Sequence, residues 1–233
     1  MNEPDINLEE SPVLVISDVH ADPAALSRVL AAVERHGPVG RRCFLGDAIG
    51  YGEDPLNALN MLKSFDICIK GNHELLALGE VNPTIYSSAA RLSVLRHCHT
   101  LPPLAFEQLR QFIPSYGTGG IVLYHGRPDN CLDYIFNDVD IGRLLDDFEQ
   151  YDLFFGGHLH IPRLAVCDRR SGQIDFPEIR IPYSRHELDL KVSRCVVNVP
   201  SVTPGRMGYE TPGACRLEHI DRRRKILEFI FAD

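Results

Sequence analysis

The chain has 233 residues, of which 44% are hydrophobic and 24% are charged, and its formal net charge at pH 7 is -8. This is the composition of a globular protein with a sizeable core. The negative charge argues against general nucleic-acid binding, which requires basic surface. It does not exclude an enzyme that acts on phosphates, because bound metal cations can supply positive charge locally.

The N-terminal residues, the absence of long apolar runs and the cysteines indicate the cellular compartment. The first ten residues, MNEPDINLEE, lack the basic start and apolar stretch of a secretory signal. No apolar run approaches the roughly 20 residues that span a bilayer, so no membrane partner is expected. The seven cysteines are scattered and never form a CxxC pair, which favours buried reduced thiols over disulfides. We therefore expect a cytoplasmic protein with one domain over residues 1–233, and the oligomeric state stays open.

Strand, loop and helix alternate in the N-terminal half of the chain. Residues 13–16 are all apolar and predict a buried strand. Asp22 and Pro23 then predict the start of a helix, whose apolar residues recur at helical spacing until Gly37 ends it. The same pattern predicts a strand at residues 42–45, a helix that starts at Asp54-Pro55, and a strand at residues 66–70.

In the second half of the chain, the predicted elements change from alternating strands and helices to mainly strands. Residues 82–113 predict helix, interrupted at Pro102-Pro103, and residues 121–124 and 153–155 predict two further strands. The segments that follow predict β structure at residues 163–168, 195–199, 214–220 and 225–231. The whole pattern indicates an α/β fold built on a mixed sheet, with a mainly β C-terminal third.

Short polar segments follow five of the predicted strands. They are DVH at residues 18–20, GD at 46–47, GNHE at 71–74, HG at 125–126 and GHLH at 157–160. Ligand sites in α/β sheets gather beyond the carboxyl ends of the strands, so these segments are expected to meet at one edge. Their glycines allow tight turns and close approach of the backbone to a ligand.

Seven residues of these segments are candidate metal ligands: Asp18, His20, Asp47, Asn72, His125, His158 and His160. Two carboxylates, one amide and four imidazoles are too rich in nitrogen for calcium or magnesium, and they include no thiolate. They suit divalent Mn, Fe, Co, Ni or Zn, with manganese favoured. Seven ligands exceed the need of one ion, whereas two ions that share a carboxylate would use them all. Two metals about 3.5–4 Å apart are the usual machinery for displacement at phosphorus.

The ordered set DxH, GD, GNH(E/D), H and GHxH resembles the signature of the calcineurin-like metallophosphoesterases, over residues 13 to at least 208. The segment GDAIGYGEDP is similar to the GD-x-x-GYG-x-DP segment of a bacterial, phosphodiesterase-type branch of that superfamily. HGRPDNCLDYIF resembles the HGSP-type segment of that branch. Residues 198–208 resemble its NPGSV…R-x-G loop, although Val199-Pro200 replaces the usual Pro-Gly.

The resemblance implies a four-layer α/β/β/α sandwich with two mixed β-sheets, and a hydrolase in which a hydroxide shared by two ions attacks phosphorus. It implies one ion held by Asp18, His20 and His160, and a second held by Asn72, His125 and His158. Asp47 would bridge the two ions. His73 would be the general acid for the leaving oxygen, and the adjacent Glu74 is a candidate to tune it. The implied substrate contacts are Tyr51, Arg127, Ser201 and Arg206.

A small phosphodiester is the expected substrate. In the protein-phosphatase branch of the superfamily, arginines after the GD and GNHE motifs clamp a monoester dianion, whereas Ala48 and Leu75 stand at these places here. A phosphomonoesterase, including a protein serine/threonine phosphatase, is the alternative. A non-catalytic scaffold, similar to the retromer subunit of this fold, is a third possibility, but a scaffold does not need the full set of ligands.

Other polar residues are interpreted as structural. Five histidines lie outside the strand-end segments and are predicted to have no role in the site: His36, His97, His99, His186 and His219. The basic run at residues 222–225 falls between two predicted strands, and it indicates a solvated turn rather than a nucleic-acid patch.

Overall fold

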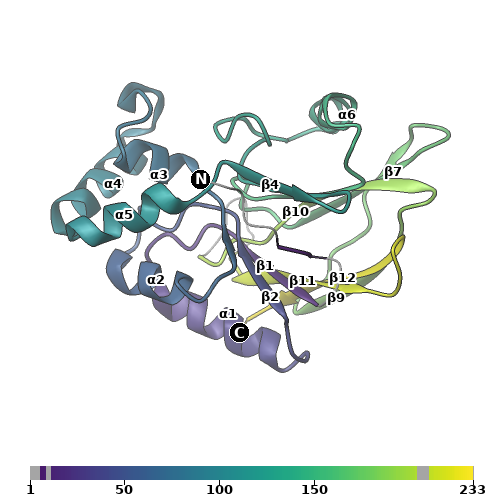
Figure 1. Ribbon diagram of the computed structural model, residues 1–233, viewed down its shortest axis with the longest axis horizontal. Helices are drawn as coiled ribbons and strands as arrows, with labels where there is room; N and C mark the ends of the chain where they lie inside the picture. The colour runs from purple at the N-terminus through teal and green to yellow at the C-terminus, as the bar shows by residue number, and fades with distance from the viewer. Residues whose placement is uncertain (1–5, 9–11, 204–209, 233) are drawn as a thin grey trace.

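The computed structural model describes residues 6–8, 12–203 and 210–232. Two six-stranded sheets pack face to face, and helices cover their outer faces, with α1 on one side of the molecule and α6 on the other (Figure 1). This is the α/β/β/α sandwich with two mixed sheets that the resemblance implied, so the predicted fold class is confirmed.

The first sheet has the order β3-β2-β1-β11-β12-β9. Its strands are β1 (Val13–Ile16), β2 (Arg41–Phe44), β3 (Ile67–Cys68), β9 (Tyr183–Asp189), β11 (Gly213–His219) and β12 (Arg224–Phe231). Strands β1, β2 and β3 run parallel to one another, and the other neighbours pair antiparallel.

The second sheet has the order β4-β5-β6-β10-β7-β8. Its strands are β4 (Ser115–Thr118), β5 (Ile121–Tyr124), β6 (Leu153–Gly156), β7 (Arg163–Asp168), β8 (Ile174–Asp175) and β10 (Ser193–Asn198). Strands β5, β6 and β10 run parallel. Each sheet therefore has a parallel half, and the polar segments predicted above follow strands of these halves.

The helices are α1 (Pro23–Glu34), α2 (Pro55–Leu62), α3 (Asn72–Ala77), α4 (Ser88–Thr100), α5 (Pro103–Gln111) and α6 (Asp138–Asp147), with a short 3-10 helix, η1 (Pro83–Ile85). Two of them begin as predicted. The Asp22 carboxylate accepts the N–H of Ala25 at the start of α1, and the Asp54 carboxylate does the same for Asn57 at the start of α2. None of the helices in the described ranges has the length and apolar character needed to cross a lipid bilayer.

Alternation along β1 explains how the layers join. Val13 and Val15 point into the apolar core between the two sheets, while Leu14 and Ile16 point into the core under α1, α2, α4 and α5. Successive side chains of a strand face opposite sides of the sheet, so a strand that is apolar throughout must be covered on both faces. A third core lies between the second sheet and α6.

Several elements differ from the sequence predictions. Strands β4 and β9 and helix α6 were not predicted, whereas residues 82–113 are mostly helical (η1, α4 and α5), with the predicted interruption before Pro103. Strand β9 reads YSRHELD and buries few of its side chains. It is an edge strand that depends on pairing with β12, and such pairing leaves little trace in local hydrophobic pattern.

All seven cysteines lie in the described ranges as free thiols. Cys43, Cys195 and Cys215 are buried, and the other four are half-buried. The expectation that the thiols are buried is therefore right for three of them.

Candidate metal centre

The loops that follow β1, β2, β3, β5 and β6 meet beyond the carboxyl ends of these strands. Backbone hydrogen bonds tie the loops together: the N–H of Asp18 donates to the Gly46 carbonyl, and that of His20 donates to the Asp47 carbonyl. In the other sheet, the Gly157 N–H donates to the His125 carbonyl. Residues far apart in the sequence thus form one buried polar cluster.

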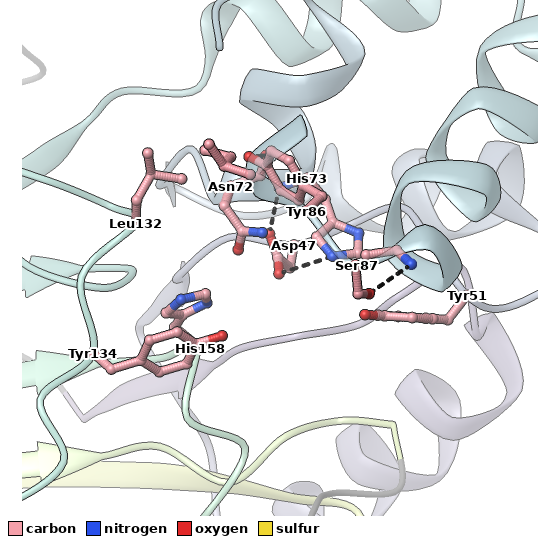
Figure 2. A pocket seen from close by; sticks show the side chains of 11 residues that line it. Asp47, Tyr51, Asn72, His73, Tyr86, Ser87, Leu132, Tyr134 and His158 are labelled. Atoms are coloured by element: carbon pink, nitrogen blue, oxygen red, sulfur yellow. Dashed lines mark hydrogen bonds and ion pairs between the residues drawn. The ribbon is translucent and has the colours of Figure 1, made fainter. Parts of the chain in front are cut away.

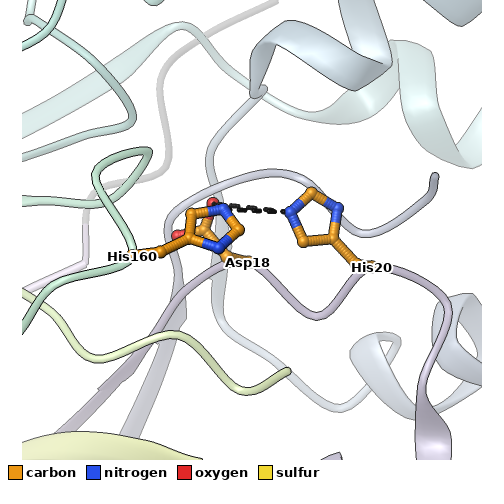
Figure 3. A group of neighbouring side chains, drawn as sticks. All are labelled: Asp18, His20 and His160. Carbon is orange, nitrogen blue, oxygen red and sulfur yellow. Dashed lines mark hydrogen bonds and ion pairs between the residues drawn. The ribbon is translucent and has the colours of Figure 1, made fainter. Parts of the chain in front are cut away.

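The first group of this cluster consists of Asp18, His20 and His160 (Figure 3). The Nε2 atom of His160 lies 3.0 Å from Asp18 Oδ1 and 3.1 Å from His20 Nε2. All three side chains are buried. Three ligand-type atoms therefore converge on one point.

The second group consists of Asn72, His125 and His158. The Nε2 atom of His125 lies 3.0 Å from Asn72 Oδ1 and 3.1 Å from His158 Nδ1. The backbone N–H of His158 donates to Asp18 Oδ2, so the first group helps to position the second.

Asp47 lies between the two groups. Its Oδ2 atom is 3.9 Å from His20 Nε2 and 3.4 Å from His125 Nε2. Its Oδ1 atom accepts the backbone N–H of His73 at 2.9 Å, and His73 Nε2 lies 3.8 Å from Oδ2. One oxygen is thus held by the backbone, and the other faces both groups of histidines.

The two groups fit divalent metal ions. Metal–ligand bonds of about 2.1 Å at right angles place two ligand atoms about 3.0 Å apart, which matches the shortest distances in both groups. The Asp18 Oδ1 atom is buried, with His160 Nε2 3.0 Å away but no well-formed hydrogen bond to it, and a buried charged oxygen without such a bond is costly. A cation at this position would supply the missing partner.

Backbone carbonyls orient the imidazole rings. The Nδ1 atoms of His20 and His73 lie 3.2 Å and 3.0 Å from the Ile49 carbonyl, and His125 Nδ1 lies 2.8 Å from the Leu45 carbonyl. Because a carbonyl only accepts, each Nδ1 carries a proton, and each Nε2 is left to face the centre.

Backbone strain concentrates in the same cluster. Among the described residues, five of the seven predicted ligands have positive φ although they are not glycine: Asp18 (55°), His20 (46°), Asp47 (62°), His158 (64°) and His160 (61°). Non-glycine residues rarely adopt such angles, and strain of this kind is retained where function requires it.

Electrostatic interactions in the cluster hold three of its side chains in the protonation state that binds a metal ion. Burial opposes the charge of Asp47, but the neighbouring His125 and His73 outweigh it and hold the pKa of the carboxyl well below its usual range. Burial, followed by the charge of nearby histidines, lowers the pKa of both His20 and His158 to about 3. Burial also acts on His125, but the charge of Asp47 prevails and raises its pKa to about 9. The Asp47 carboxylate is therefore charged and the imidazoles of His20 and His158 are neutral, as metal binding requires, whereas His125 holds a proton that a metal ion would have to displace.

Glu74 has a different partner from the one expected. Its buried carboxylate accepts the backbone N–H groups of Asp47, Ala48 and Gly71 at 2.8–2.9 Å. His73 contacts the Ile49 carbonyl instead. Burial and the nearby Asp47 raise the pKa of Glu74 to about 7. Glu74 thus holds the GD loop against the start of α3 rather than tuning His73.

The four candidate substrate contacts lie in different settings. Tyr51 lines the cavity beside the cluster. Arg127 is held by the carboxylates of Asp129 and Asp147 and is not among the lining residues. The Ser201 hydroxyl donates to the Asp18 carbonyl and so supports the DVH loop. Arg206 lies outside the described residues.

His97 is one residue of the site region that sequence reasoning missed. From the buried side of α4, its Nδ1 accepts the Gly50 N–H at 3.0 Å, and its Nε2 donates to the Gly52 carbonyl at 2.9 Å. It thereby clamps the loop that carries Tyr51. The signal was available in the spacing of Ala90, Val94 and His97, which places His97 on the apolar face of the helix.

Gly50 shows how closely this loop approaches His73. A Cβ atom at this position would lie 2.0 Å from His73 Nδ1, and its φ of +94° also disfavours other residues. A residue with a side chain at position 50 would therefore clash with the His73 imidazole, so the loop requires glycine there.

The family model for calcineurin-like phosphoesterases matches residues 11–162, which include the whole cluster. The chain belongs to this family. The two groups around Asp47 are where this family member could bind divalent metals.

One relative and two solved structures are similar to this chain. An uncharacterized protein of Methanocaldococcus jannaschii is 26% identical over 168 residues, which cover 66% of this chain and 64% of that protein. The match thus spans less than two thirds of the length of the relative. A metallophosphoesterase from Sphaerobacter thermophilus has a TM-score of 0.74 at 24% identity, covering 95% of this chain and 88% of that one. A hypothetical protein of Pyrococcus horikoshii has a TM-score of 0.69 at 15% identity, with the same coverage. These two structures show the shared fold.

Proposed function

We propose that this protein hydrolyses a small phosphodiester with the help of two divalent transition-metal ions, manganese being the favoured one. The observation that carries the proposal is the position of Asp47 Oδ2, which lies 3.9 Å from His20 Nε2 and 3.4 Å from His125 Nε2. A carboxylate oxygen that faces both groups is placed where it could contact two neighbouring ions.

The ligand roles follow from the two groups. Asp18, His20 and His160 would hold one ion, Asn72, His125 and His158 would hold the other, and Asp47 would contact both. Two ions bound in this way would lower the pKa of a water and neutralise charge that develops on the phosphoryl oxygens.

His73 would protonate the leaving oxygen. Its Nδ1 proton is committed to the Ile49 carbonyl, and His73 lines the cavity, so the proton for the leaving oxygen must come from Nε2. Burial lowers the pKa of His73, although the charge of Asp47 opposes the shift. A lowered pKa makes the imidazolium a stronger acid but reduces its protonated fraction at neutral pH.

The preference for a diester rests on charge. Among the described residues that line the cavity there is no lysine or arginine. A monoester dianion carries one more negative charge than a diester, and a charge-assisted bond to arginine is the usual way to bind it. Ala48 and Leu75 follow the GD and GNHE motifs and offer no such bond.

The test is a metal-reconstituted assay on aryl phosphate monoesters and diesters with the same leaving group, with a phosphopeptide alongside and elemental analysis of the protein. We expect about two transition-metal ions per chain and a higher kcat/KM for the diester. A strong preference for the monoester or the phosphopeptide would show a phosphomonoesterase. A protein that binds no metal and hydrolyses none of these esters would contradict the proposal entirely.

A further inference from the structure

A cavity of about 390 Å³ opens beside the metal centre. Asp47, Asn72, His73 and His158 form the side of the cavity that faces the two groups. Its size is that of a site for a small molecule. The remaining lining residues therefore contact whatever is attached to the phosphate.

Tyr51 forms one wall of this cavity. Its side chain is 39% exposed, and its ring centroid lies 5.1 Å from that of His73 and 4.9 Å from that of His20. Hydrogen bonds from α4 hold its loop: His97 contacts Gly50 and Gly52, and Arg96 donates to the carbonyls of Tyr51 and Gly52. The ring is thus presented to the cavity from an anchored loop.

Tyr134 lies on the other side of Asp47 (Figure 2). It is 45% exposed, and its ring stacks on that of His158 with the centroids 3.9 Å apart and an angle of 23° between the planes. Leu132 and Tyr86 line the cavity as well, so much of the remaining wall is aromatic or apolar. Tyrosine rings in such positions stack well on flat ring systems.

The charged side chains near the cavity are already paired. Arg127 binds Asp129 and Asp147, and Arg96 binds Glu53. The described lining residues include no cationic side chain, so a second phosphate group in the substrate would have no partner there. The cavity is suited to an uncharged, planar group.

We infer that the substrate is a phosphodiester monoanion whose two ester arms are uncharged and carry planar rings, of the nucleoside or aryl class. The leaving arm lies at Tyr51, because His73, which protonates it, is on that side, and the retained arm lies at Tyr134. The inference rests on the proposed function.

The reaction balances without a further reactant. A water oxygen forms the new bond to phosphorus and releases one proton to solvent, from which His73 is reprotonated after the reaction, and the bond between phosphorus and the leaving oxygen breaks. The electron pair stays on the leaving oxygen, which takes its proton from His73 Nε2. The retained arm leaves as a phosphate monoester.

The test uses the manganese-loaded protein and diesters with one leaving group, p-nitrophenolate, and different retained arms. The retained arms are thymidine, phenyl and methyl. We expect kcat/KM to be roughly tenfold or more higher for the two ring-bearing arms than for methyl. Tyr134→Ala should abolish this ratio, and Tyr134→Phe should keep it, because the ring and not the hydroxyl provides the stacking surface.

The variant Tyr51→Ala distinguishes binding of the leaving arm from binding of the retained arm. It should lower kcat/KM for all three diesters by a similar factor and leave the ratio between retained arms unchanged, while Tyr51→Phe retains activity. Leu104→Ala serves as the control, because Leu104 is exposed on α5 outside the cavity.

Two results would overturn the inference and leave the proposed function intact. One is hydrolysis of the diesters with no preference for a ring, or a preference that survives Tyr134→Ala. The other is a higher kcat/KM for a dinucleoside tetraphosphate than for the thymidine ester, since this would require a cationic partner. Hydrolysis of monoesters alone would overturn both the inference and the proposed function.

Discussion

Asp47 is the side chain on which both groups of the metal centre depend. Its loss removes the oxygen that faces His20 and His125. We therefore expect Asp47→Ala to lower metal content. It should also reduce kcat/KM by more than roughly 100-fold, because the loss of a residue that only orients a metal ligand already costs roughly 10–100-fold. Metal analysis and a diester assay measure both effects.

The control for this variant is Asp146→Ala, which removes an exposed carboxylate from α6 and should change neither quantity. An Asp47→Ala protein with full activity and two bound ions would disprove the bridging role.

His73 contributes at a different step. It contacts Asp47 only through the backbone N–H and at a distance of 3.8 Å through its ring, so its removal should leave the ions in place. We expect His73→Ala to lower the rate by roughly 10²–10⁴-fold for esters with poor leaving groups. The defect should shrink as the pKa of the leaving alcohol falls, because good leaving groups need less protonation. If the variant loses its metal, His73 is a ligand or a structural support instead.

At the scale of elements, helix α4 positions the loop that carries Tyr51. His97 satisfies the buried N–H of Gly50, and an unsatisfied buried donor costs about 1–3 kcal/mol. We expect His97→Ala to lower the free energy of unfolding by that amount and to raise KM, while metal content stays normal. Urea unfolding and steady-state kinetics measure the two effects.

His99→Ala is the matched control for this prediction. His99 lies two residues further along the same helix and is exposed, so its loss should affect neither stability nor KM. Unchanged KM in His97→Ala, together with reduced stability, would mean that His97 supports the fold and not the loop.

At the scale of the whole molecule, metal binding should stabilise the fold. The ligands come from both sheets, so the ions bind only the folded chain, and a ligand present at 100 times its Kd adds about 2.7 kcal/mol to stability. We expect a chelator to lower Tm and added manganese to restore it. Metal binding must displace the proton of His125, whose pKa is raised to about 9, so the affinity for manganese should fall as the pH drops below that value. An affinity that stays constant between about pH 9 and about pH 6 would contradict ligation by His125.

A second whole-molecule prediction concerns His219, which lies on β11 away from the metal centre. Burial, and then the charge of Lys225, lowers its pKa to about 4. The unfolded chain therefore binds more protons than the folded one between pH 4 and about 6.5. The stability of the protein should fall as the pH drops through this window, and His219→Gln should reduce that dependence. Urea unfolding of the metal-free protein at several pH values measures this pH dependence. If the free energy of unfolding changes with pH equally in the wild type and in His219→Gln, the lowered pKa of His219 is refuted.

The sequence alone determined the family, the fold class and the residues of the five polar segments. These features are local, because a strand is recognised from its apolar run and a segment such as GNHE from adjacent residues. The order of the segments along the chain then carried the resemblance. The strand at residues 13–16 and the caps at Asp22 and Asp54 agree with the structure for the same reason.

Only the tertiary structure decided which side chains meet. Glu74 contacts the backbone of a loop 27 residues away, and His97 contacts one 47 residues away. Arg127, a candidate substrate contact, is instead held by Asp129 and Asp147. Hydrogen bonds between distant segments depend on how the two sheets and their helices pack, and the local spacing of apolar residues does not predict that packing. For this reason the ligand-type residues could be predicted from the sequence, whereas the groups that orient them could not.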